Sequence, residues 1–163
     1  MNRKILLTVL PFFIVLLVTP YVGMAYAKPS TTVSGTIMLT SVVPLEGRPA
    51  GKSDNIIFLF DITEDWSGDI AGTGTTESTW VTHNFVAPMG GPDTWFNVYE
   101  KLILDATVLG ESGTLTMELI IVGTEGRWTI LGGTGGLANL RGHGTATLTT
   151  IPYSYTGQVH FDP

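Results

Sequence analysis

The sequence predicts an all-β protein, a small eight-stranded antiparallel β-barrel that follows an N-terminal hydrophobic signal helix. Three observations predict this architecture. Beyond the N-terminal segment, Gly, Pro and Thr punctuate the chain, apolar and polar residues alternate between these breaks, and no window carries the apolar period of a helix. Closure into a barrel removes the exposed edges of an open sheet. An immunoglobulin-like sandwich is the alternative all-β architecture.

The first 27 residues have the pattern of a secretory signal peptide. Two basic residues precede an apolar run, and the segment ends in Ala25-Tyr26-Ala27, whose small residues suit a signal peptidase. Residues 1–27 are therefore expected to be removed by cleavage before Lys28, which predicts a secreted, extracellular protein. The alternative is an uncleaved helix that anchors the protein, because the segment is just long enough to span a bilayer.

Residues 28–163 are expected to form a single β-barrel domain. The chain has no Cys, which excludes a disulfide scaffold, and a domain of this size can bury a core without disulfides. Without the leader it has 6 basic and 14 acidic residues, a net charge of −8. This acidity disfavours binding to nucleic acid and, after signal cleavage, to anionic membrane surfaces.

Eight strands are expected between the turn signals of this domain. They are Thr31–Val43, Ile56–Trp66, Asp69–Ser78, Trp95–Leu109, Gly113–Val122, Arg127–Gly132, Gly142–Thr150 and Tyr153–Phe161. Of the connections, Pro44–Asn55 is expected to be a long polar loop, and Ser67-Gly68 and Glu111-Ser112 are expected to be tight reversals.

Alternation within these strands assigns side chains to the inner or the outer face, because successive side chains point to opposite sides of a sheet. In Trp95–Leu109 the even-numbered positions are apolar except for Glu100, so this carboxylate is expected to face the interior. The apolar inner set comprises Phe96, Val98, Leu102, Leu104, Ala106, Val108, Leu115, Met117, Leu119, Ile121, Tyr153, Tyr155, Val159 and Phe161. Four glycines fall on the same side, where a curved sheet brings backbone close to backbone: Gly72, Gly74, Gly142 and Gly144.

Several segments together carry a resemblance to a known family. They are Trp66–Gly74 with its Gly-Asp-Ile-x-Gly-x-Gly pattern, Tyr99-Glu100-Lys101, the glycine-rich run Gly132–Gly144, and Ser154–Gly157 before His160-Phe161-Asp162. These segments resemble a family of bacterial and archaeal domains of unknown function that is grouped with the allene oxide cyclase-like barrels. The glycine-rich run also resembles an element of plant dirigent proteins, which share this barrel. The resemblance implies an eight-stranded barrel with a central cavity and no assigned activity.

Other motifs predict neither a cofactor nor a metal. Gly133–Ala138 satisfies the dinucleotide pattern Gly-x-Gly-x-x-Ala, but no helical pattern follows it, so we expect a structural turn in which glycine supplies positive φ. His83, His143 and His160 lack the short spacing that places two imidazoles on one metal, although Asp162 is close to the last of them. No nucleophile elbow or P-loop is present.

Glu100 is the residue whose expected position most suggests a function. A carboxylate that faces a barrel interior must be paired, hydrogen-bonded or neutralised. It is therefore the one candidate catalytic residue. The structural alternative is that Glu100 bonds the hydroxyl of Tyr153 or Tyr155, a Trp indole, or an inward-turned Arg127, and so holds the register of the barrel.

The favoured function is a noncatalytic secreted barrel that binds a small apolar or amphipathic ligand in its cavity, with Glu100 as the polar anchor. The expected lining comprises Phe60, Val98, Leu102, Met117 and Tyr155. An alternative is a cyclase or isomerase resembling allene oxide cyclase, in which an interior carboxylate guides a reactive substrate. Apart from that carboxylate, the cyclase's polar pocket residues have no matching positions here. A further alternative is a noncatalytic surface protein that self-associates as a homo-oligomer.

Overall fold

The computed structural model describes residues 29–51, 54–83 and 95–163, and most of these residues belong to strands. The predicted signal peptide lies outside the described residues. The strands are β1 (Thr31–Pro49), β2 (Ile56–Gly68), β3 (Ile70–His83), β4 (Trp95–Val108), β5 (Glu111–Val122), β6 (Glu125–Gly133), β7 (Leu140–Thr147) and β8 (Tyr153–Phe161), with the 3-10 turn η2 (Gly135–Leu137) between β6 and β7. Within the described ranges, no helix has the length and apolarity that a membrane crossing requires.

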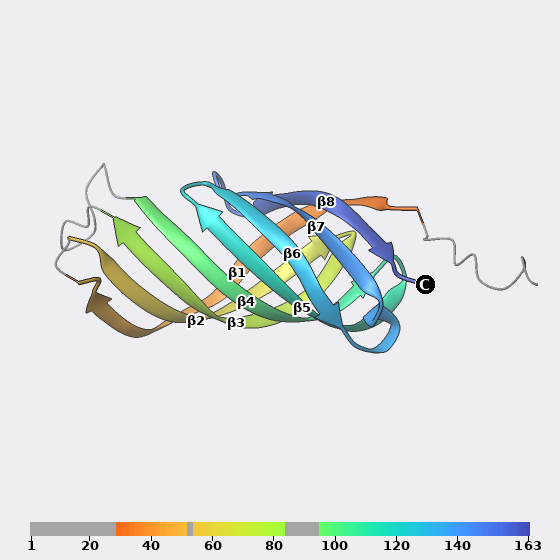
Figure 1. Ribbon diagram of the computed structural model, residues 1–163, viewed down its shortest axis with the longest axis horizontal. Coiled ribbons are helices and arrows are strands. Elements are labelled where there is room, and N and C mark those ends of the chain that lie inside the picture. Colours follow the sequence, from red (N-terminus) through yellow and green to blue (C-terminus); the bar gives the residue numbers. More distant parts are fainter. Residues whose placement is uncertain (1–28, 52–53, 84–94) are drawn as a thin grey trace, which may run out of the picture.

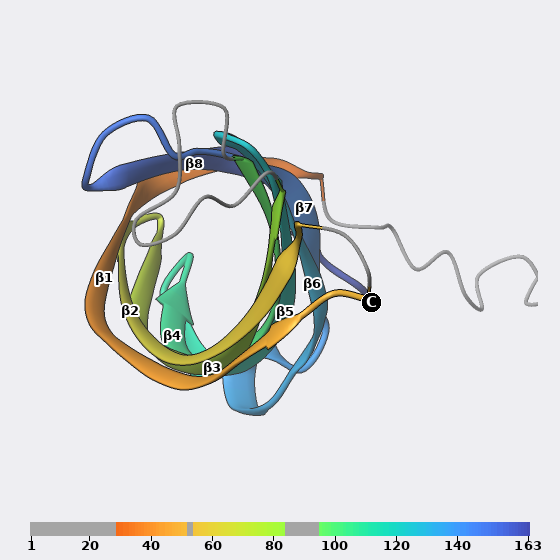
Figure 2. The ribbon, with the colours of Figure 1, turned by 90° about the vertical axis from the view of Figure 1, so that its left-hand side faces the viewer.

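The eight strands form one ring-like sheet. Each strand pairs antiparallel with the next, and β8 returns to pair with β1, which is the strand order of a closed barrel. Figure 1 shows the ring from the side, and Figure 2 shows the view through it. The β4–β5 turn and the end of β8 lie at one end, which we call the C-terminal end; the β5–β6 turn and the β7–β8 connection lie at the other, the distal end. The prediction of an all-β fold with eight antiparallel strands is confirmed.

The predicted loop Pro44–Asn55 is wrong over its first half, because β1 continues there as a strand. Its pairing with β2 extends to Pro49 opposite Ile56, and two register shifts interrupt the ladder. Such bulges bend a strand and let it continue past residues that fit a regular ladder poorly. The pairing with β8 ends at Ile37, so the later part of β1 is an edge, the setting in which strands tolerate proline.

The turn between β4 and β5 also differs from the prediction. Glu111-Ser112 belongs to β5, and the reversal is made by Leu109 and Gly110, whose φ values are 53° and 87°. Two consecutive residues with positive φ form the type I′ turn whose twist matches a two-residue hairpin. The sequence signal was obscured because the first of these residues is an apolar leucine, which seldom adopts positive φ.

Other strand ends shift by a few residues. β3 continues to His83 instead of ending at Ser78, and β5 and β6 each begin two residues earlier than expected. The seventh strand covers Leu140–Thr147 instead of Gly142–Thr150. The eighth strand has the predicted bounds. Strand ends depend on pairing partners that a single segment does not reveal.

The interior of the C-terminal half is filled by side chains. Trp66 and Tyr155 pack with ring centroids 4.9 Å apart, and Trp128 meets Tyr155 edge-on at 6.3 Å. The Tyr155 hydroxyl accepts a hydrogen bond from the Ile70 N–H (2.8 Å) and donates one to the Ile70 carbonyl oxygen (3.0 Å). The predicted inward faces are confirmed by fully buried side chains, among them Val98, Leu102, Leu104, Val108, Leu115, Met117, Leu119, Ile121 and Val159.

Candidate functional site

A cavity of about 100 Å³ lies in the distal half of the ring. Its wall is mostly apolar and includes three aromatic side chains, and its polar side-chain groups belong to Glu64, Glu100, Thr124, Tyr153 and Trp80. None of the described residues that line it is a Lys, Arg or His. The lining comprises Ile37, Leu39, Glu64, Trp80, Phe96, Val98, Glu100, Leu119, Ile121, Gly123, Thr124, Ala146, Leu148 and Tyr153.

Glu100 extends into this cavity from the middle of β4 and is 5% exposed. Ser78 lies opposite it in the β3–β4 ladder, and its hydroxyl donates to Oε1 of Glu100 at 2.7 Å. The Trp80 indole N–H donates in turn to the Ser78 hydroxyl oxygen at 2.7 Å. The second carboxyl oxygen, Oε2, is buried and has no hydrogen-bond partner among the described residues. One oxygen of Glu100 is thus held in place while the other is left free.

Glu64 on β2 is a second buried carboxyl group that lines the same cavity, and sequence reasoning missed it. It is 2% exposed, and its Oε2 accepts a hydrogen bond of 2.9 Å from the indole N–H of Trp66. The alternation that identified Glu100 contained the signal for Glu64 as well. Ile62 and Trp66 flank it two residues away on either side and are both buried, so the three side chains share the inner face.

The two carboxyl groups perturb each other's ionisation. Burial, and secondarily the charge of Glu64, raises the pKa of Glu100 from 4.5 to about 8, although the Ser78 hydrogen bond opposes the rise. Burial also raises the pKa of Glu64, against the lowering effect of the Trp66 hydrogen bond. Two carboxylates that share a poorly solvated site resist ionising together. Below about pH 8, therefore, Glu100 is mainly protonated and the pair carries at most one negative charge.

The partners expected for Glu100 in a purely structural role are not the ones that the structure provides. The hydroxyl of Tyr155 is engaged by the backbone of Ile70, and Arg127 is exposed on the outer face. Tyr153 lines the cavity but does not hydrogen-bond to Glu100. The partner is Ser78, through which the Trp80 indole contributes only indirectly.

The predicted ligand-binding residues divide between the cavity and the filled interior. Val98 and Glu100 line the cavity. Phe60 is outside the lining and packs against Trp80, with ring centroids 5.0 Å apart. The other three are buried in the core outside the cavity lining: Leu102, Met117 and Tyr155. Alternation shows which side chains point inward but not how far along the ring the open space lies.

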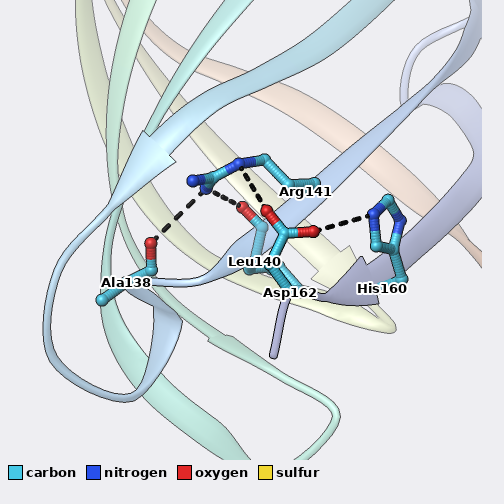
Figure 3. Close-up of polar contacts among 5 residues, drawn as sticks. All are labelled: Ala138, Leu140, Arg141, His160 and Asp162. Atoms are coloured by element: carbon cyan, nitrogen blue, oxygen red, sulfur yellow. Dashed lines mark hydrogen bonds and ion pairs between the residues drawn. The ribbon is translucent and has the colours of Figure 1, made fainter. Parts of the chain in front are cut away.

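The C-terminal end carries a polar cluster, shown in Figure 3. Asp162 contacts Arg141 Nε and His160 Nε2, each at 3.2 Å, and Arg141 also donates to the carbonyl oxygens of Ala138 and Leu140. The side chains of the Arg141–Asp162 pair are 40% and 44% exposed, so the pair adds little stability. The cluster ties the chain after β8 to the start of β7.

The remaining histidines lie apart from this cluster. His83 stacks on Trp95, with ring centroids 3.9 Å apart, and contacts the side-chain amide of Asn97. His143 is exposed on β7, on the predicted outer face. Among the residues that the structure describes, no group of three or more His, Cys, Asp or Glu side chains is placed to hold a metal ion.

The glycine-rich segment forms a turn, as expected from its sequence. The only helical element in it is η2, three residues of 3-10 helix, and Gly135 has a φ of 60°. A pyrophosphate site of the dinucleotide type requires the N-terminus of a longer α-helix. The buried side chain of Leu137 instead anchors the turn in the core.

Of the comparisons with known proteins, one solved structure supports the fold. No family model matches the chain, and no curated protein matches it. A solved structure from Shewanella oneidensis MR-1, a protein of unknown function from the DUF3224 family, is similar with a TM-score of 0.63 and 13% identity, covering 83% of this chain and 99% of that one. A structure of pyocyanin demethylase has a TM-score of 0.40 and 17% identity, covering 79% and 99% of the two chains. The resemblance to the allene oxide cyclase-like family stays a prediction.

Proposed function

We propose that this protein is a noncatalytic binding protein that holds a small amphipathic molecule in the cavity beside Glu64 and Glu100. The observation that carries the proposal is the unpartnered Oε2 of Glu100, buried in a largely apolar cavity. A buried polar atom without a hydrogen bond costs about 1–3 kcal/mol, and a ligand that donates to it recovers that cost. The apolar wall supplies the rest of the binding energy, as in most small-molecule sites.

The size of the cavity limits the ligand. An apolar cavity of about 150 Å³ accommodates the six carbon atoms of benzene, so the part of a ligand that enters about 100 Å³ has about four non-hydrogen atoms. Gly123 and Thr124 of the β5–β6 turn belong to the wall. The cavity therefore reaches the distal end of the ring, and this is the end from which we expect a ligand to enter.

A substitution that fills the cavity tests the proposal. Ala146 is a fully buried wall residue, and Ala146→Leu would occupy most of the space. We expect native mass spectrometry to show a small bound molecule on the protein purified from its host, and none on this variant. The matched control is Ala71→Leu. Ala71 is exposed on β3, so this variant should retain the bound molecule.

Two outcomes would contradict the proposal. One is the same bound mass on Ala146→Leu as on the unmodified protein, which would place the molecule elsewhere. The other is the absence of a bound molecule from all three proteins, together with unchanged melting temperatures when small amines, alcohols and acids are added. That result would leave ordered water as the occupant of the cavity.

We also propose that the binding domain acts outside the cytoplasm, after export. The support is the basic, apolar and small-residue order of the first 27 residues. N-terminal sequencing of the protein recovered from the host is expected to begin at Lys28. A mature protein that still begins at Met1 would instead favour the membrane-anchored alternative.

A further inference from the structure

Among the described residues, the cavity is lined by two acids and by no Lys, Arg or His, and this imbalance suggests the chemical class of its ligand. Resting on the proposed function, we infer that the ligand is a small organic cation, a protonated amine on a short apolar body, whose ammonium group binds between Glu64 and Glu100. Buried charges in proteins are paired with opposite charges or with metal ions. Here no described lining residue supplies a positive charge, so without a ligand Glu100 is neutralised by its own proton, and a cationic ligand would displace that proton and pair with the carboxyl groups.

The hydrogen-bonding pattern favours a donor with several N–H groups. Each carboxyl group has one oxygen bound by a neighbouring side chain: Glu100 by Ser78 and Glu64 by Trp66. Both hydrogen bonds orient the carboxyl groups without neutralising them. An alkylammonium group has three donors, which suffice to bind the free Oε2 of Glu100 and to contact Glu64 at the same time.

The rest of the wall also suits a cation with an apolar body. Trp80, Phe96 and Tyr153 contribute aromatic rings, and such rings attract cations by their π electrons. An inorganic ion fits less well. Calcium requires about six to eight oxygen ligands, and the cavity offers two carboxyl groups among mainly apolar side chains. An anionic ligand would be repelled by the carboxyl pair.

Three probes of nearly equal shape test this inference: n-butylamine, n-butanol and butyrate. The amine is protonated at neutral pH, as a lysine side chain is. In ligand-observed NMR titrations of the purified protein, we expect butylamine to bind at least about tenfold more tightly than butanol, the factor that corresponds to one charge-assisted hydrogen bond, and butyrate not to bind. Glu100→Gln should reduce the preference for the amine to less than about threefold, and Glu64→Gln should reduce it in the same direction.

The control variant is Glu77→Gln, which removes an exposed carboxylate from the outer face of β3 and should leave the preference unchanged. If butanol binds as tightly as butylamine, the inference about charge is wrong but the proposed binding function stands. If none of the three probes binds, both fail. Should Glu100→Gln not fold, as judged by near-ultraviolet circular dichroism, the ranking of the probes on the unmodified protein decides the question.

Discussion

Glu100→Gln is expected to raise the free energy of unfolding at about pH 8 and to flatten its dependence on pH. Folding raises the pKa of Glu100 from 4.5 to about 8. Between these values the folded state keeps a proton that the unfolded state has released, so stability falls as pH rises. The loss is at most about 1.4 kcal/mol per pH unit, which gives an upper limit of about 5 kcal/mol over the window. Above about pH 8 both states are ionised at this group, and its contribution no longer changes.

The measurement is urea-induced unfolding of both proteins at a series of pH values from about 5 to about 8. The other titratable groups that line the cavity are Glu64 from β2 and Tyr153 from β8. Because burial also raises the pKa of Glu64, a smaller slope should remain in Glu100→Gln and should largely vanish when Glu64→Gln is added. Glu77→Gln should keep the full slope. Parallel curves for Glu100→Gln and the unmodified protein would show that Glu100 ionises as it does in water.

The alternation of side chains predicted the interior because one strand can be interpreted without its neighbours. Glu100 was identified in this way, since every other even-numbered position of its strand is apolar. Glu64 obeys the same rule between Ile62 and Trp66, but its strand alternates less clearly, because the other face also carries the apolar residues Ile57 and Leu59. The partner of Glu100 could not be predicted, because Ser78 comes opposite it only through the register of β3 and β4.

The position of the open space could not be predicted either. Leu102 and Glu100 are neighbours on the inner face of β4, yet only Glu100 lines the cavity. The difference arises because Trp66, Trp128 and Tyr155 fill the C-terminal half, and bulky side chains from distant strands meet there. The late part of β1 was missed for a related reason: its prolines and charges resemble a loop until β2 is seen to pair with it.

Gly157→Ala is expected to destabilise the fold by about 3 kcal/mol or more, which is the upper range for overpacking a core. Gly157 of β8 lies opposite Gly144 of β7, and the indole of Trp128 covers both. A Cβ atom added at Gly157 would lie closer than 3.0 Å to the Trp128 ring and to the carbonyl oxygen of His143. The second contact is with backbone, so a change of side-chain rotamer does not relieve it.

The matched control is Gly132→Ala, because a Cβ added there meets no atom within 4 Å and the residue is not in the positive-φ region. Its free energy of unfolding should change by less than about 0.5 kcal/mol, as for most unconstrained surface positions. Adding Trp128→Ala to Gly157→Ala should not restore stability, since the contact with His143 remains and a large buried ring is lost. Equal unfolding midpoints for Gly157→Ala and Gly132→Ala would mean that β7, β8 and the indole do not approach one another as closely as the closed ring requires.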